Sequence, residues 1–312
     1  MAITGSSWDL VNYLGELFTA SRTKTPILSA AGDMAGANTV QTDQFPLSVE
    51  YSLPAAGQNV RSENDAVTAP TAVDVTTSQT VQAIQIMQHA IQVTYKTQSN
   101  MNKITGIADT NMPMAISDWV DFQIARKIDV IKRDMEYSAI NGTYVANTGE
   151  TIEGACRGLL EAISDASNGV AAAGADLSKT LITRMLKEAY DDGAQMGNMA
   201  LYVNSYQKTV ISSIYEYVPA DRFLGGSNIQ AIETDFGKVS VELNSFTPTN
   251  TVLLVELNDI KNVFQPVPKK GLIFYEDLGK AGAATTGHLY TQWSFDYGPS
   301  FDHNAITGLA TS

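Results

Sequence analysis

The residues that could carry chemistry are few: three histidines, one cysteine and some neighbouring carboxylates. His89, His288 and His303 lie far apart in the sequence, and none has a partner at metal-ligand spacing or within a nucleophile motif. Cys156 is the only cysteine, which excludes an intramolecular disulfide framework and a cysteine-cluster metal site. We therefore expect ordinary polar roles for the histidines, no bound metal and no cofactor.

One tripeptide resembles a catalytic motif. Asp235-Phe236-Gly237 spells the magnesium-binding motif of protein kinases. A kinase also needs a glycine-rich loop, a strand lysine and a catalytic loop upstream, and the sequence contains none of them. Because Asp and Gly supply turn geometry, the motif predicts a hairpin turn instead.

Adjacent carboxylates occur at Asp191-Asp192 and at Glu276-Asp277. Neighbouring residues on a helix point away from each other, so Asp191 and Asp192 are unsuited to act as an acid–base pair. We interpret both pairs as solvated surface. A metal-dependent hydrolase using Asp191 or Asp277 is the alternative from the enzyme class, and it requires a convergent polar pocket with perturbed carboxylates.

The charge balance argues against direct binding of nucleic acid. The 312 residues include 20 basic and 33 acidic side chains, which gives a formal net charge of −13. Proteins that bind DNA directly gain much of their affinity from Lys and Arg on phosphates. No apolar run approaches the roughly 20 residues of a membrane span, and the first residues lack the pattern of a signal peptide. We therefore expect a soluble chain that folds in a reducing cytoplasm.

The elements that would have to position any site include an unusual stretch, Ala66 to Asn100. It is rich in Thr, Gln, Val and Ile, and Asp74 and Lys96 are its only full charges. This composition favours extended backbone, yet the apolar residues are too sparse to build a core of their own. We predict two antiparallel arms of about 15 residues each, reaching roughly 50 Å. Such arms need a partner surface, because an isolated hairpin is marginal in water.

The apolar side chains of this stretch change parity along the chain. Ile84 and Ile86 are at even-numbered positions, whereas Ile91, Val93 and Tyr95 are at odd-numbered positions, so in a regular strand the two sets would point to opposite faces. We predict a bulge near Gln88 and His89 that decides which face meets a partner. A separate strand is predicted from the alternation between Phe45 and Leu53.

The clearest helix runs from Ile116 to Ile140. Apolar residues from Val120 to Met135 recur at helical spacing and form one continuous stripe. Ser117 is the predicted N-cap, and Asn141-Gly142 is the predicted stop. The opposite face is expected to meet solvent or another subunit, and its charged residues are Arg126, Lys127, Asp129, Lys132, Arg133 and Glu136.

Shorter elements flank the β-stretch and the long helix. An amphipathic helix is predicted from Trp8 to Ala20. From Glu150 the pattern becomes α/β, with helices over 156–166, 181–195 and 205–215 and strands over 200–204 and 251–257. A hairpin over 229–246 and strands over 260–265, 271–275 and 288–297 complete a β-rich end. How the final residues pack is left open.

The order of these modules resembles the major capsid protein of tailed bacteriophages, which has the Hong Kong 97-type fold. An arm, an extended β-loop, a long helix, a central α/β region and a β-rich return follow one another as in that family. A local likeness to the end of a phage major head protein covers about residues 229 to 309. Its motifs are DFGKVSVELNSF, NTVLLVELNDIKNVFQP and HLYTQWSFDYGPSFDHNAITGL.

The resemblance implies an α+β fold of the Hong Kong 97-like kind with five parts. They are an N-arm (1–45), an extended β-loop (46–105), a peripheral domain with its spine helix (106–150), an axial α/β domain (151–255), and return strands with a C-terminal tail (256–312). It also implies a virion protein made in the bacterial host cytoplasm. Its partners would be copies of itself in hexamers and pentamers, with scaffolding, portal and decoration proteins. The shell would enclose double-stranded DNA without sequence-specific binding and would contact no membrane.

Subunit interfaces are expected on the arm, the β-loop and the long helix. The candidate residues are Trp8, Leu14, Phe18, Val81, Ile84, Ile86, Ile91, Val93, Tyr95, Arg126 and Arg133. An encapsulin-like nanocompartment shell on the same fold is the alternative within this class, and protein cargo in place of DNA would distinguish it. A secreted β-rich binding protein is disfavoured by the missing signal and the long central helix.

Overall fold

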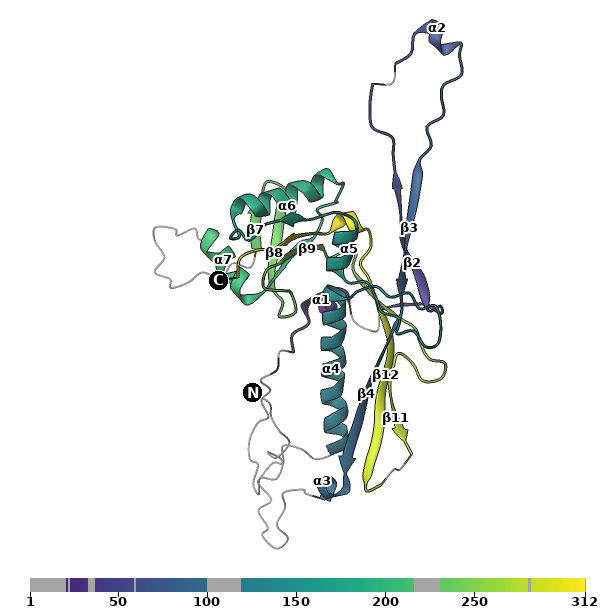
Figure 1. Ribbon diagram of the computed structural model, residues 1–312, viewed down its shortest axis with the longest axis vertical. Coiled ribbons are helices and arrows are strands. Elements are labelled where there is room, and N and C mark those ends of the chain that lie inside the picture. Colours follow the sequence, from purple (N-terminus) through teal and green to yellow (C-terminus); the bar gives the residue numbers. More distant parts are fainter. Residues whose placement is uncertain are drawn as a thin grey trace.

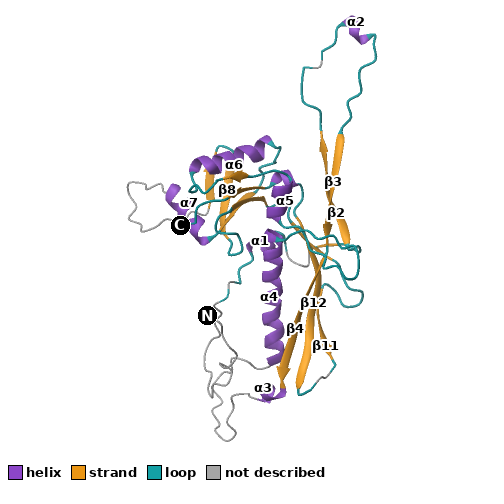
Figure 2. Cartoon of the chain, in the orientation of Figure 1, coloured by secondary structure: helices purple, strands orange, loops and turns teal. Residues whose placement is uncertain are grey.

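The computed structural model describes residues 21, 23–32, 37–58, 60–99, 119–215, 231–279 and 282–311. Figure 1 shows three parts: a long sheet with one long helix beside it, a six-stranded sheet with its own helices, and a two-stranded ribbon that projects from the body. Figure 2 shows that the ribbon continues into a long loop with a single short helix at its far end. No helix among the described residues is long and apolar enough to cross a membrane.

The long sheet is organised around β12 (Ala284–Asp296). On one side β12 pairs antiparallel with β4 (Gln85–Thr94), and on the other with β11 (Ile273–Leu278) and β10 (Lys261–Phe264). The short strand β1 (Asn38–Thr39) adds a parallel edge to β10. The strands predicted from residue 260 onward are confirmed, and β12 begins earlier than predicted.

Helix α4 (Trp119–Asn141) packs against β4 and β12. Ile131 and Met135 of the predicted stripe are fully buried, and the stripe's earlier residues pack against the same core while partly exposed. The helix ends at Asn141, which confirms the predicted stop. The predicted N-cap Ser117 lies outside the described residues.

The chain leaves α4 through a close contact between two glycines. Gly158 donates its backbone N–H to the Gly142 carbonyl at 2.9 Å. A Cβ atom on Gly142 would lie 2.4 Å from the Ser138 carbonyl oxygen, and one on Gly158 would lie 2.5 Å from the Gly142 nitrogen. Only glycine fits at these two positions, so the loop between them is held against the end of the helix.

The alternation along β4 is regular, which corrects the bulge predicted near His89. The register between β4 and β12 is continuous along the whole strand. Ile91 and Val93 face the core, whereas Ile86 on the opposite face is 60% exposed. The parity changes instead at Ile84, a buried residue between β3 and β4.

The six-stranded sheet has the order β5-β13-β9-β6-β8-β7. All residues of its central strands β9 (Val252–Glu256) and β6 (Met199–Val203) are buried, and their side chains alternate between two hydrophobic cores. The sheet is therefore covered on both faces, as continuous apolar strands require. The remaining strands are β5 (Val170–Ala171), β7 (Ala231–Thr234), β8 (Gly237–Leu243) and β13 (Asn304–Thr307).

Three helices belong to this part of the chain: α5 (Leu159–Asp165), α6 (Lys179–Asp191) and α7 (Ser205–Ile214). The prediction of three helices here is confirmed, with shorter bounds than expected. The predicted hairpin is also confirmed, since β7 and β8 pair antiparallel across a turn at Asp235 and Phe236. The kinase-like tripeptide is therefore a turn between two strands.

The last strand, β13 (Asn304–Thr307), lies in a different sheet from the one predicted for the end of the chain. The resemblance implies that residues 256–312 form return strands of the peripheral domain and a C-terminal tail. After β12, however, the chain passes through a short 3-10 helix (Ser300–Asp302), and β13 then pairs with β9 and β5 in the six-stranded sheet. Ala305 and Ile306 of β13 are fully buried, and burial of such apolar side chains explains why this segment packs.

The ribbon is formed by β2 (Gln44–Ser52) and β3 (Thr76–Ala83), which pair antiparallel. Helix α2 (Glu63–Ala66) lies in the loop between them, and α3 (Tyr95–Ser99) follows β4. This corrects the prediction that Ala66 to Asn100 form a hairpin with each other. The two halves of that stretch separate at Ile84: β3 belongs to the ribbon, while β4 belongs to the long sheet because its apolar face packs on α4.

Candidate subunit interface

The ribbon, defined here as residues 44–83, exposes apolar side chains to solvent. Their exposed fractions range from 39% at Val81 to 86% at Val67. Scattered apolar surface residues are ordinary, but such a series on one projecting element makes the ribbon a candidate interaction surface. Its members are Tyr51, Leu53, Val60, Val67, Val73, Val75 and Val81.

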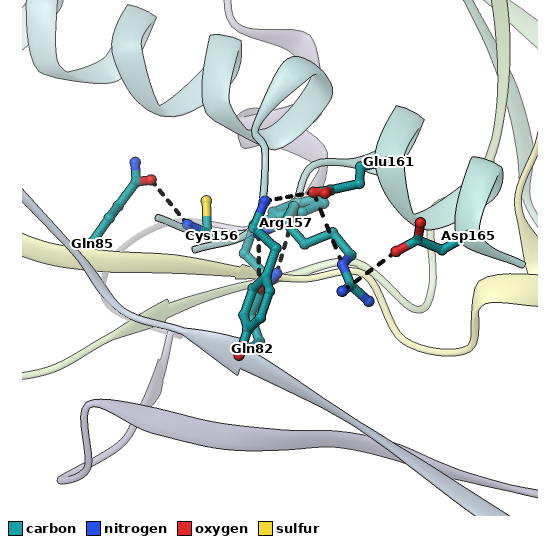
Figure 3. Close-up of polar contacts among 8 residues, drawn as sticks. Gln82, Gln85, Cys156, Arg157, Glu161 and Asp165 are labelled. Carbon is teal, nitrogen blue, oxygen red and sulfur yellow. Dashed lines mark hydrogen bonds and ion pairs between the residues drawn. The ribbon is translucent and has the colours of Figure 1, made fainter. Parts of the chain in front are cut away.

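Gln82, which is fully buried, fixes the base of the ribbon. Its side-chain amide pairs with both backbone groups of Arg157. The Arg157 N–H donates to Gln82 Oε1 at 2.7 Å, and Gln82 Nε2 donates to the Arg157 carbonyl at 2.9 Å (Figure 3). Gln82 Nε2 also donates to the Phe295 carbonyl of β12 at 2.9 Å. One amide thus connects the ribbon, the loop after α4 and the long sheet.

The side chain of Arg157 extends this anchor to α5. Its guanidinium lies over the Tyr144 ring, 4.9 Å from the centroid, and its Nη2 lies 3.4 Å from Asp165 Oδ2. Glu161 Oε2 lies 4.0 Å from Arg157 Nε and accepts the Tyr144 N–H at 2.6 Å. Figure 3 shows Arg157 between Gln82 and the two carboxylates of α5.

Gln85, the residue directly after Ile84, adds further contacts at the base of the ribbon. Gln85 Oε1 accepts the Cys156 N–H at 3.3 Å, and Gln85 Nε2 donates to Ser138 Oγ of α4 at 3.1 Å. Burial raises the pKa of the Cys156 thiol to about 12, so this cysteine is unreactive at neutral pH. The base of the ribbon is therefore a network of hydrogen bonds and ion pairs, in which the buried Arg157 Nε lacks a hydrogen-bond partner. These contacts give the ribbon a fixed starting direction.

Gln82→Ala is expected to lower the free energy of unfolding by about 1–3 kcal/mol, because it leaves the two backbone groups of Arg157 without partners. Urea denaturation measures the loss, and hydrogen exchange at β3 shows whether the ribbon's base has loosened. Gln79→Ala is the matched control, since Gln79 is an exposed residue of the same strand. An equal effect of both substitutions would contradict the anchoring role of Gln82.

A second anchor joins α1 (Pro26–Ala30) to α4 through Glu136. Glu136 Oε1 accepts the Ile27 N–H at 3.0 Å, and Oε2 accepts the Leu28 N–H at 2.8 Å; the Asn244 side chain donates to Oε1 as well. Burial raises the pKa of Glu136, and these three hydrogen bonds lower it. Glu136 is fully buried, which corrects its predicted place on the solvated face of the helix.

Three of the predicted interface residues lie inside the chain's own core. Ile84, Ile91 and Val93 are each no more than 4% exposed. The interface assignment is wrong for Ile91 and Val93 because β4 is a strand of the long sheet and α4 covers the face that carries them. Ile84 precedes β4 and packs in the same hydrophobic core. Their side chains are thus already packed within a single subunit.

The other predicted residues remain candidates. Ile86, Tyr95 and Val81 are 60%, 42% and 39% exposed. Arg126 is exposed and pairs with Asp129 at 3.0 Å on its own helix. Arg133 is half-buried, and Trp8, Leu14 and Phe18 lie outside the described residues.

Sequence reasoning missed the residues that build the two anchors. A signal for Glu136 was available, since it lies four residues before the buried Ile140 and helical spacing therefore puts it on the buried side. Gln82 and Arg157 carried no such signal. Their contacts join positions 75 residues apart, which local periodicity does not report.

The histidines make structural contacts. His89 Nε2 lies 2.7 Å from Asp134 Oδ2 and joins β4 to α4. His303 is fully buried; its Nδ1 accepts the Glu256 N–H at 3.2 Å, and its Nε2 contacts the Tyr297 carbonyl. Because Nδ1 accepts a hydrogen bond, Nε2 carries the proton, and burial lowers the pKa of this neutral imidazole.

Of the paired carboxylates considered above, Asp191 and Glu276 are held in ion pairs, and Asp277 is exposed. Asp191 pairs with Lys187 one turn earlier on α6. Glu276 pairs with Lys270 at 2.6 Å, and His288 lies 3.9 Å from the same carboxylate. Across the described part of the chain, no three His, Cys, Asp or Glu side chains are grouped so as to hold a metal ion.

Comparison with known proteins places this chain among capsid proteins. A family model described as SU10 major capsid protein matches residues 2–310. No curated protein matches the sequence.

Several solved structures share the fold. The capsid asymmetric unit of cyanophage A-1(L) is 12% identical, with a TM-score of 0.61, over 97% of this chain and 98% of that chain. The capsid of an empty GTA particle is 12% identical, with a TM-score of 0.57, over 99% of both chains. The holo-SrpI encapsulin complex from Synechococcus elongatus PCC 7942 is 11% identical, with a TM-score of 0.56, over 100% of this chain and 98% of that chain. At these identities the likeness shows a shared mixed α/β fold.

Proposed function

The chain belongs to the SU10 major capsid protein family, and from this membership we propose how its parts build an icosahedral head. It is a major capsid protein, and the head is formed from many copies of it. We assign the parts by the Hong Kong 97-type layout. The long sheet and α4 form the peripheral domain with its spine helix, the six-stranded sheet forms the axial domain, and the ribbon forms the extended loop.

The observation that carries this proposal is the exposed ribbon with its fixed base. Phe45 and Leu47 are buried at its base, but its apolar side chains from Tyr51 to Val81 are exposed, while Gln82 and Arg157 hold its direction. In the head, the ribbon lies across the peripheral domain of a neighbouring subunit. Full burial of one valine or leucine side chain contributes on the order of 1.5–3 kcal/mol, from which the cost of association must be subtracted. Many such contacts per shell give stability through multivalency.

The N-arm provides a second link between subunits. Glu136 fixes the point at which α1 joins the body. Trp8, Leu14 and Phe18 of this arm clasp a neighbouring subunit. The arm and the ribbon together connect each subunit to more than one neighbour.

The head encloses double-stranded DNA without sequence-specific contacts. The net charge of −13 limits adhesion of packaged DNA to the wall, because like charges repel. Its further partners are a scaffolding protein, a portal protein and a decoration protein. Subunits are made in the cytoplasm of the bacterial host.

Electron microscopy of the purified full-length chain, produced with a scaffolding partner where one is needed, tests the proposal. Closed shells of uniform size are the expected result. A stable monomer that forms no shells under any of these conditions would contradict it.

A nanocompartment shell is the second candidate, favoured by the likeness to the SrpI encapsulin. The two candidates differ in what the particle contains. Double-stranded DNA within particles isolated from an infected host supports the phage head. Copurified protein cargo and no DNA supports the nanocompartment.

A further inference from the structure

The ribbon has two chemically different faces. In an antiparallel pair, residues directly opposite one another point to the same face. Tyr51 lies opposite Thr77, whereas Glu50 lies opposite Ser78. The first face is named here the Tyr51 face. Leu53 and Val75, which follow the same alternation in the sequence, lie just beyond the paired residues and are exposed.

The other face, named the Glu50 face, carries polar side chains. Ser52 lies opposite Thr76 on this face, and Asp74 continues the same alternation. The two faces therefore differ in charge as well as in polarity. Glu50 and Asp74 are both carboxylates, while the Tyr51 face has none.

A contact within the chain shows which face is free. Glu50 Oε1 accepts hydrogen bonds from the backbone N–H and the Oγ of Ser300, both at 3.1 Å. At Glu50, the Glu50 face is thus turned toward the body of its own subunit. Tyr51, on the opposite face, is 66% exposed.

Charge indicates what covers the free face. Every copy of the chain carries a net charge of −13, so two copies repel each other wherever their carboxylates approach. An uncharged apolar face allows a second copy to approach without that repulsion. Since the head consists of copies of this chain, a second copy is the partner that such a face fits.

We propose that the Tyr51 face is the surface through which the ribbon packs on a second copy of this chain, while the Glu50 face stays turned toward its own subunit. This inference rests on the proposed function, which brings the ribbon to a neighbouring subunit. It adds which of the two faces makes the contact. The residues that carry it are Tyr51, Leu53, Val75 and Thr77.

Two adjacent threonines provide a matched test. Thr77 and Thr76 are both exposed residues of β3, on the Tyr51 face and the Glu50 face respectively. Thr77→Glu places an unpaired carboxylate in the proposed contact, which is costly to bury. We expect it to reduce the yield of sedimenting particles by about tenfold or more. A change of this size is expected when one contact per subunit is weakened. Thr76→Glu should assemble like the unmodified chain.

Cysteine labelling gives a second readout that does not depend on a change in assembly. Cys156 is buried and unreactive, so a thiol introduced at the surface is the one that maleimide labels. In shells of Thr77→Cys the label should be excluded, and in shells of Thr76→Cys it should react as fast as in free subunits. Both variants should label quickly before assembly.

The outcomes separate this inference from the proposed function. If both glutamate variants assemble equally, if both fail, or if only Thr76→Glu fails, the face assignment is overturned while the capsid function stands. Protection of Thr77→Cys that appears only after a second protein species is added would also overturn it, because the occupant would then be another protein. If the unmodified chain forms no shells at all, the proposed function fails first.

Discussion

A chain in which an Asn-Gly turn replaces residues 53–75 is expected to fold normally and to form no shells. Ser52 and Thr76 are directly paired, so a two-residue turn can close the shortened ribbon without moving either strand. All described residues of the removed segment are exposed, so no core contact is lost. The free energy of unfolding should change by less than about 0.5 kcal/mol.

Assembly should fail because the shortened ribbon no longer reaches the neighbouring subunit and lacks most of its exposed apolar side chains. Sedimentation and negative-stain microscopy measure shell formation, and urea denaturation confirms the fold. A control that replaces only Glu63, Asn64 and Asp65 of α2 by alanine preserves the length of the loop and should leave most assembly intact. Normal shells from the shortened chain would contradict the role of the ribbon.

Glu136→Ala is expected to have the largest effect on the stability of the subunit itself. The substitution leaves the Ile27 N–H, the Leu28 N–H and the Asn244 amide without an acceptor in a buried site. One unsatisfied buried group costs about 1–3 kcal/mol, so a total loss of about 3 kcal/mol or more is expected. Urea denaturation measures the loss, and hydrogen exchange at Ile27 and Leu28 reports the release of α1.

Asp129→Ala is the control for this substitution. Asp129 lies on the same helix in an exposed ion pair with Arg126, so its removal should change the free energy of unfolding by less than about 0.5 kcal/mol. Comparable effects of the two substitutions would show that Glu136 is not an anchor.

The pH dependence of stability provides a further check on Glu136. Burial raises the pKa of this carboxyl above its ordinary value of 4.5, so the folded chain holds the proton more tightly than the unfolded chain. Its contribution to stability is therefore greatest below pH 4.5 and is lost as the pH rises through the raised pKa. In Glu136→Ala, the decrease in folding stability between pH 4.5 and the raised pKa of Glu136 should be absent.

The elements with strong local periodicity could be predicted from the sequence. The long helix α4, the buried strands β6 and β9, and the hairpin around Asp235 all follow from spacings within one short segment. Each of these elements buries an apolar face that its own sequence pattern already displays. The order of modules was enough to predict the capsid fold class.

Strand pairing in the ribbon could not be predicted in the same way. β2 and β3 pair across residues 53–75, and the alternation within each strand carries no information about its partner. The composition of β3 and β4 is alike, and Ile86 shares the parity of Ile84, so the sequence pattern places the parity change near His89 and not at Ile84. Because the alternation shifts at Ile84, Ile91 and Val93 lie in the core, whereas the sequence predicts them at an interface.

The two anchors were missed for a related reason. A carboxylate such as Glu136 is ordinarily solvated, and its burial depends on backbone donors that lie 108 residues or more away in the sequence. The side-chain amide of Gln82 is likewise buried, and it forms hydrogen bonds with backbone groups of Arg157 and Phe295 in place of water. Tertiary contacts of this kind become visible only once the chain has folded.

A cryo-electron microscopy map of assembled shells, at a resolution that traces side chains, tests the central claim most directly. We expect each ribbon to lie across a neighbouring copy of the chain, with Tyr51, Val75 and Thr77 in the contact and Glu50 turned toward Ser300 of its own subunit. A shell in which the ribbon touches only its own subunit or solvent would contradict the claim.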